Sequence, residues 1–171
     1  EIICCGDIVG YGPHPAECIE LVRKSGARTV MGNHDYYTLI GHSRPDSVPK
    51  GPDSLTNPVW AGIRHAVKHL SDDDFAWLAS LPRVIEIPGG LAGHAALHDP
   101  EHWPYLLGDA DARPTLEMLE RVHQSIAFFG HTHRRALWYR DIRGKVALRQ
   151  ISPALMRLSP EEHYLINPGS V

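Results

Sequence analysis

The chain has 171 residues, of which 43% are hydrophobic and 22% charged, and its formal net charge at pH 7 is −3. This length and composition are typical of one globular domain that needs neither disulfides nor a structural metal to fold, so we interpret residues 1–171 as a single domain. No apolar segment approaches the roughly 20 residues that span a bilayer, and no cluster of Lys and Arg indicates nucleic-acid binding. The expected partners therefore include neither a membrane nor a nucleic acid.

The cysteines indicate the redox compartment of the protein, and the histidines indicate what its side chains can bind. The three cysteines are an odd number, and two of them are adjacent at positions 4 and 5, where a strand would point them to opposite faces. We therefore predict reduced thiols and a cytoplasmic protein. The 12 histidines are a large supply of the side chain that most often binds transition metals and moves protons near neutral pH.

The first part of the chain predicts a βαβ unit. Residues 2–5 and 28–31 are apolar strand candidates, and residues 14–24 between them place apolar side chains at helical spacing. Such a unit forms two parallel strands with a right-handed crossover. Residues 41–56 contain three prolines among serines and aspartates, which predicts an irregular loop.

Two helices and two strands are predicted next. One helix covers residues 58–70, and a second follows Ser71, which resembles an N-cap with an acidic first turn, and ends before Pro82. Strand candidates over residues 84–87 and 91–98 are separated by a Pro-Gly-Gly turn.

The last part of the chain predicts a helix, a strand and a hairpin. Residues 114–122 have helical periodicity and residues 125–129 form a buried strand candidate. Alternating segments at 136–140 and 145–151 predict a β-hairpin, and a final strand is expected over residues 163–166.

Three of the strand candidates end in a glycine followed by side chains that bind metals. These endings are Gly-Asp at 6–7, Gly-Asn-His-Asp at 32–35 and Gly-His-Thr-His at 130–133. A fourth strand candidate ends at His98 without the glycine. Because ligands of open α/β sheets bind beyond the carboxyl ends of the strands, these endings are expected to meet in space. Gly-Asp and Gly-Asn-His-Asp alone each fit an ordinary turn. Gly-His-Thr-His is harder to explain in that way, because two histidines so close together after an apolar strand gain nothing for packing, and the endings together indicate a metal site.

The order of these motifs resembles the calcineurin-like metallophosphoesterase superfamily. The segment Gly-Asp-Ile-Val-Gly-Tyr-Gly-Pro at 6–13 and the closing Asn-Pro-Gly-Ser at 167–170 are similar to its small bacterial phosphodiesterase branch. The resemblance implies an α/β fold in which two β-sheets form a sandwich flanked by helices, a four-layer αββα arrangement. It also implies a site for two metal ions at one edge.

The resemblance assigns metal ligands by position. Asp7 is the carboxylate expected to bridge both ions, Asn33, His98 and His131 are expected to complete one ion, and His133 to bind the other. The mixed nitrogen and oxygen donors favour Mn, Fe, Co, Ni or Zn over Ca or Mg, so the expected cofactor is two divalent transition-metal ions. Two such ions lower the pKa of a shared water and hold the phosphoryl oxygens for in-line attack.

A catalytic pair is also implied. His34 matches the family histidine that contacts the phosphate and assists the leaving oxygen, and Asp35 is expected to orient it or balance its charge. The remaining histidines, His94 among them, are interpreted as surface or packing residues. The family pattern also includes an Asp-x-His motif on a first strand, which the sequence does not contain before Asp7. We therefore interpret the chain as N-terminally truncated and incomplete at both ends, with the motif expected upstream of Glu1.

The expected activity is hydrolysis of phosphate esters, phosphodiesters above all, with a small molecule or nucleotide as substrate. One alternative is a phosphatase acting on phosphoprotein or on a dinucleoside polyphosphate, with Trp103 and Tyr105 available to stack on a base. Another is a binding scaffold that has lost catalysis, although a scaffold has no use for His34 beside metal ligands. A single structural metal is a third alternative, and it predicts that removing the metal unfolds the protein.

Overall fold

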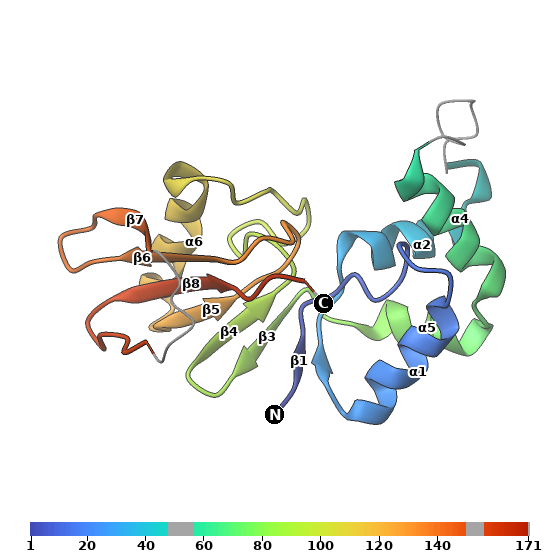
Figure 1. The fold of residues 1–171 in the computed structure, drawn as a ribbon, viewed down its shortest axis with the longest axis horizontal. Coiled ribbons are helices and arrows are strands. Elements are labelled where there is room, and N and C mark those ends of the chain that lie inside the picture. The colour runs from blue at the N-terminus through green and yellow to red at the C-terminus, as the bar shows by residue number, and fades with distance from the viewer. Residues whose placement is uncertain (48–56, 150–155, 171) are drawn as a thin grey trace. The chain divides into compact units, whose positions relative to one another are not determined.

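The computed structural model describes residues 1–47, 57–149 and 156–170, which form two compact units, Glu1–Pro82 and Arg83–Val171 (Figure 1). The first unit has a two-stranded sheet and the second a six-stranded sheet. Helices accompany both sheets. The prediction of an α/β fold with two sheets and flanking helices is confirmed at the level of a mixed α/β fold in which a multistranded sheet is flanked by helices. The three cysteines are free thiols, and no described helix is long and apolar enough to cross a bilayer.

The first unit begins with the predicted βαβ arrangement. Its elements are β1 (Ile3–Cys4), α1 (Pro15–Ser25), β2 (Arg28–Thr29), α2 (Asn33–Ser43), the 3-10 helix η1 (Pro45–Ser47), α4 (Pro58–His69) and α5 (Asp72–Ser80). Strands β1 and β2 are parallel, with Ile3 opposite Arg28. Gly26 ends α1 in the left-handed conformation with φ 67°, which glycine adopts without a steric penalty. The helices enclose a core that includes Ile19, Ile63 and Leu78, all fully buried.

The structure corrects the sequence prediction at the start of α2 and confirms it at the start of α5. Helix α2 begins at Asn33, with residues 30–32 between it and β2, so residues 33–35 of the Gly-Asn-His-Asp motif form its first turn. The predicted loop over 41–56 begins only after Ser43. Residues 48–56 of that loop lie outside the described residues. The N-cap at Ser71 is confirmed, because its hydroxyl accepts the backbone N–H of Asp74 while the Asp74 carboxylate accepts the backbone N–H of Ser71.

The second unit is built on a mixed sheet with the strand order β3-β4-β5-β8-β6-β7. Its elements are β3 (Val84–Ile87), β4 (Gly90–Gly93), α6 (Asp109–Arg121), β5 (Ile126–Phe128), β6 (Ala136–Arg140), β7 (Val146–Arg149) and β8 (His163–Asn167). Strands β4, β5 and β8 are parallel neighbours, whereas β3 and β6 run antiparallel to theirs. Helix α6 packs on this sheet (Figure 1) and buries Leu116 and Leu119 against Phe129 and Leu165.

The observed bounds of β4 and α6 differ from the predicted ones, and the β6–β7 hairpin agrees with the prediction over the described residues. Strand β4 ends at Gly93 and not at residue 98. Helix α6 starts at Asp109, before the predicted residue 114, because the Asp111 carboxylate caps it by accepting the backbone N–H of Gly108 at 3.0 Å; Pro114 is therefore inside the helix. The β6–β7 hairpin is confirmed, and residues 150–151 of its predicted second strand lie outside the described residues.

Candidate active site

In the first unit, the Asp35 carboxylate fixes the loop that follows β1. Its Oδ2 accepts the backbone N–H groups of Asp7 and Gly32, both at 2.9 Å. Its Oδ1 accepts those of Ile8 at 2.9 Å and Val9 at 3.2 Å. Asp35 is fully buried, and a buried carboxylate is stable only when such donors satisfy it. Asp35 therefore ties the loop to the first turn of α2, a role that the sequence did not predict.

The charge of Asp35 is governed by opposing influences. Burial, and then the neighbouring Asp7 carboxylate, raise the pKa of Asp35 to about 7. The backbone N–H groups of Gly32, Val9 and Asp7 lower it, because hydrogen bonds to a carboxylate favour its charged form. A cation bound at Asp7 would act in the same direction as these donors.

Asp7 is held in an uncommon backbone conformation with φ 57°. Its Oδ1 accepts the backbone N–H of His34 at 3.0 Å. A Cβ added at Gly32 would lie 2.2 Å from this same Oδ1, so only glycine permits the approach of the two segments. Positive φ at a residue other than glycine concentrates at functional sites, where surrounding contacts enforce it.

His34 lies in the first turn of α2, with 3% of its surface exposed. The Tyr11 ring stacks on the His34 ring with a centroid separation of 4.1 Å and an interplanar angle of 22°. Asn33 precedes it at the first position of the helix and is half-buried. The structure thus brings together the predicted site residues of the first unit around the β1 loop and the start of α2.

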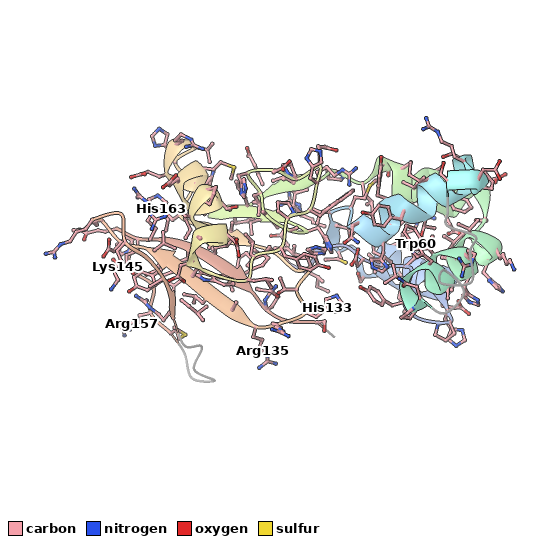
Figure 2. The ribbon with its side chains drawn as sticks, turned by 90° about the horizontal axis from the view of Figure 1, so that it is seen from above. Trp60, His133, Arg135, Lys145, Arg157 and His163 are labelled. Atoms are coloured by element: carbon pink, nitrogen blue, oxygen red, sulfur yellow. The ribbon has the colours of Figure 1, made fainter. Side chains whose placement is uncertain are left out.

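In the second unit, the Gly-His-Thr-His segment also has a strained backbone. His131 and His133 adopt φ values of 60° and 56°. The segment is held by Asn167, which is fully buried and donates from Nδ2 to the Gly130 carbonyl at 2.6 Å and to Thr132 Oγ1 at 3.0 Å. The closing Asn-Pro-Gly-Ser motif therefore supports the histidine loop. Figure 2 shows the exposed His133 side chain at the outside of this unit, as it does that of Arg135.

The histidine that contacts His131 is His94, the residue directly after β4. His94 Nε2 lies 3.1 Å from His131 Nδ1. Two nitrogen ligands of one octahedral ion, each at about 2.1 Å, are separated by about 3 Å, so this pair fits a shared metal ion. Burial, followed by the neighbouring His94 and His133, lowers the pKa of His131 to about 4. The ring is then neutral at physiological pH, which is the form that binds metals.

His98 has a different position from the one predicted. Because β4 ends at Gly93, His98 is not at the end of the strand but in the following turn. Its Nδ1 lies 2.8 Å from Thr115 Oγ1 on α6. His94 is not among the ligands predicted from the sequence, although Gly93 and His94 repeat the glycine and histidine found at two of the other strand ends.

The two aromatic side chains proposed to stack on a base have different exposures. Trp103 is 7% exposed, and the Arg83 guanidinium lies 4.2 Å from its ring centroid. Tyr105 is 58% exposed and stacks on His131 with a centroid separation of 4.1 Å. Of these two, only Tyr105 therefore presents its ring to solvent.

Comparisons with known proteins identify the family of this chain. The family model described as calcineurin-like phosphoesterase matches residues 1–135. The uncharacterized protein MJ0912 of Methanocaldococcus jannaschii is 34% identical over 180 residues, covering 100% of this chain and 64% of the relative. A symmetrical bis(5'-nucleosyl)-tetraphosphatase of Actinobacillus pleuropneumoniae is 30% identical over 130 residues, covering 72% and 43%. The chain thus spans less than two thirds of the length of these relatives.

Solved structures show the same similarity. A metallophosphoesterase from Sphaerobacter thermophilus superposes with a TM-score of 0.72 at 25% identity, covering 99% of this chain and 65% of the other. The hypothetical protein PH1004 from Pyrococcus horikoshii shares the fold, with a TM-score of 0.67 at 14% identity and coverage of 96% and 61%. Because the family model matches residues 1–135 of the 171-residue chain, the chain belongs to the calcineurin-like phosphoesterase family.

Proposed function

We propose that the protein hydrolyses phosphate esters, phosphodiesters above all, with two divalent transition-metal ions. The observation that carries the proposal is the 3.1 Å separation of the His94 and His131 ring nitrogens in a member of the calcineurin-like phosphoesterase family. Ions bound by these residues would acidify water and neutralise charge on the phosphoryl oxygens.

The proposed ligands come from both units. Asp7 and Asn33 belong to the first, and His94, His131 and His133 to the second. Family membership is the reason for assigning both sets to one binuclear centre. The geometry around His131 supports His94 in place of His98 as the third histidine. The carboxylate, amide and imidazole donors suit Mn, Fe, Co, Ni or Zn.

His34 is the proposed general acid. An imidazole can donate a proton to a leaving oxygen or stabilise it, and the main chain of His34 is held by its backbone N–H, which donates to Asp7 Oδ1. Asp35 acts through the backbone, since its hydrogen bonds place Asp7 and the residues that follow it.

Dinucleoside polyphosphates are a second candidate substrate. The similarity to a symmetrical bis(5'-nucleosyl)-tetraphosphatase and the exposed Tyr105 ring, which offers a stacking surface for a base, both favour this class. Hydrolysis of a dinucleoside tetraphosphate measured beside bis-p-nitrophenyl phosphate would separate the two candidates.

The test of the proposed function combines turnover with metal analysis. In the metal-loaded protein, we expect His34→Ala to lower turnover of bis-p-nitrophenyl phosphate by about 10²–10⁴-fold, the usual contribution of a general acid. Metal content measured by elemental analysis should stay unchanged, because His34 is not a proposed ligand. Turnover equal to that of the wild type would contradict the role assigned to His34, and absence of hydrolysis in the wild type with every metal would contradict the proposed function.

A further inference from the structure

Tyr11 combines a solvent-exposed ring with a contact to the buried His34. The side chain is one of the most exposed large aromatic groups in the first unit, with 58% of the residue surface accessible. One face of its ring nevertheless stacks on His34 at a centroid separation of 4.1 Å. An exposed tyrosine gains little from burial, so the placement of this ring needs another physical reason.

The loop that carries Tyr11 is built to approach His34. Gly10 adopts φ 96°, and a Cβ added there would lie 2.7 Å from His34 Nδ1. On the other side, Gly62 of α4 approaches so closely that an added Cβ would lie 1.9 Å from the Gly10 carbonyl oxygen. His65 Nε2, also on α4, lies 2.9 Å from the Pro13 carbonyl oxygen. Helix α4 therefore holds this loop against the start of α2.

The contacts of His34 divide between backbone and ring. The backbone N–H of His34 donates to Asp7 Oδ1, which fixes the main chain but leaves the side-chain torsions to other contacts. The stacked Tyr11 ring blocks rotation of the imidazole out of its plane, and aromatic stacking of this kind favours one relative orientation. A fixed orientation of the general acid raises the rate of the reaction, because a small displacement of the proton donor lowers turnover.

We propose that Tyr11 is a positioning residue, whose ring holds the His34 imidazole in the orientation that serves the leaving oxygen. The inference rests on the proposed function and deepens it. The ring, and not the phenol hydroxyl, performs this role, so phenylalanine at position 11 should replace tyrosine.

The kinetic test varies the leaving group. For Tyr11→Ala in the metal-loaded protein, we expect kcat to fall by about 10-fold or more for diphenyl phosphate, which has the more basic leaving phenolate. For bis-p-nitrophenyl phosphate we expect kcat to fall by a smaller factor, because proton donation matters most for the more basic leaving group. KM should stay unchanged for both substrates. Tyr11→Phe should match the wild type, as should Leu21→Ala, a matched control at an exposed position of α1.

A double-mutant comparison and a spectroscopic readout complete the test. Adding Tyr11→Ala to His34→Ala should cause no further loss, because two residues that act through one group are not additive. In the metal-free protein, histidine-selective NMR should show the His34 ring signal, assigned with His34→Ala, shifted in Tyr11→Ala and retained in Tyr11→Phe, since a stacked ring changes its magnetic environment.

The outcomes separate this inference from the proposed function. Equal losses for both substrates, an additive double mutant or an unmoved His34 signal would each overturn the positioning role while phosphodiester hydrolysis stands. Absence of hydrolysis in the wild type and in Leu21→Ala would overturn the proposed function, and the positioning role would fall with it.

Discussion

At the scale of single residues, three of the proposed ligands share an uncommon backbone conformation. Asp7, His131 and His133 all have φ between 56° and 60°, a region in which a residue with a Cβ pays on the order of 1–3 kcal/mol. The Asp35 carboxylate, which accepts the backbone N–H of Asp7, and the Asn167 amide, which donates to the Gly130 carbonyl, hold the two loops concerned. Strain of this kind persists where function requires the side-chain directions that it produces.

Gly10 and Gly12 offer a matched test of the loop geometry. We expect Gly10→Ala to lower the free energy of unfolding by about 1–3 kcal/mol, because its φ of 96° disfavours a Cβ and that Cβ would contact the His34 ring. Gly12→Ala should have little effect, since a Cβ there meets open space. Urea denaturation of both variants measures the difference. Equal stabilities would show that the loop does not press on His34 as described.

His94 and His98 have different contacts, and metal analysis separates their roles. We expect His94→Ala to weaken binding of Mn²⁺ or Zn²⁺ by more than about 100-fold, beyond the loss typical of an outer-shell partner. His98→Ala should retain metal and lower the free energy of unfolding by about 1–3 kcal/mol, because it leaves the buried Thr115 hydroxyl without the histidine. The reverse pattern, with metal lost only in His98→Ala, would restore the ligand set predicted from the sequence.

At the scale of elements, the first residue of a helix is set by capping side chains within a few positions of it, and these can be identified in the sequence. Ser71 and Asp74 form reciprocal hydrogen bonds at the start of α5, as the spacing predicts. The start of α6 shows the limit of such patterns. Proline is common in a first helical turn, so Pro114 indicated the wrong boundary, whereas the Asp111 carboxylate that caps the helix lies earlier.

The capping interaction gives a prediction for α5. Ser71→Ala should lower the free energy of unfolding by about 1 kcal/mol, the usual value of a lost N-cap. Ser71→Asp should retain most of that stability, because a carboxylate also accepts the N–H groups of the first turn and interacts favourably with the helix dipole. Thermal denaturation monitored by circular dichroism measures both. An alanine variant as stable as the wild type would show that the cap contributes nothing.

At the scale of the whole molecule, each unit has an apolar core that contains no proposed metal ligand. Ile19 and Leu78 are fully buried in the first unit, as are Leu116 and Phe129 in the second. Burial of such side chains is the main stabilising contribution to folding. The protein should therefore not depend on metal in order to fold.

Metal removal tests that expectation. After treatment with EDTA we expect a folded, inactive protein that keeps its far-ultraviolet circular dichroism and melts cooperatively at a lower temperature. Loss of ligand at 100 times its Kd removes only about 2.7 kcal/mol, which a protein with its own core tolerates. Adding Mn²⁺ or Zn²⁺ should restore hydrolysis. Unfolding on chelation would instead support a single structural metal.

The sequence by itself determined the fold class, most of the elements and the segments that carry the candidate chemistry. Local patterns suffice for these, because alternation, helical periodicity and glycine at the ends of strands act over a few neighbouring residues. The hairpin around residues 136–149 and the cap at Ser71 are examples.

Only the tertiary structure decided which side chains meet. Whether His94 or His98 approaches His131 depends on where β4 ends beside β5, and that is set by pairing between strands far apart in the chain. The roles of Asp35 and Tyr11 likewise depend on contacts between residues far apart in the chain. Tyr11 lies 23 positions before His34 and Ile8 lies 27 positions before Asp35, and no local pattern encodes such contacts. Long-range packing fixes these contacts, so the sequence supplied the candidates and the fold selected among them.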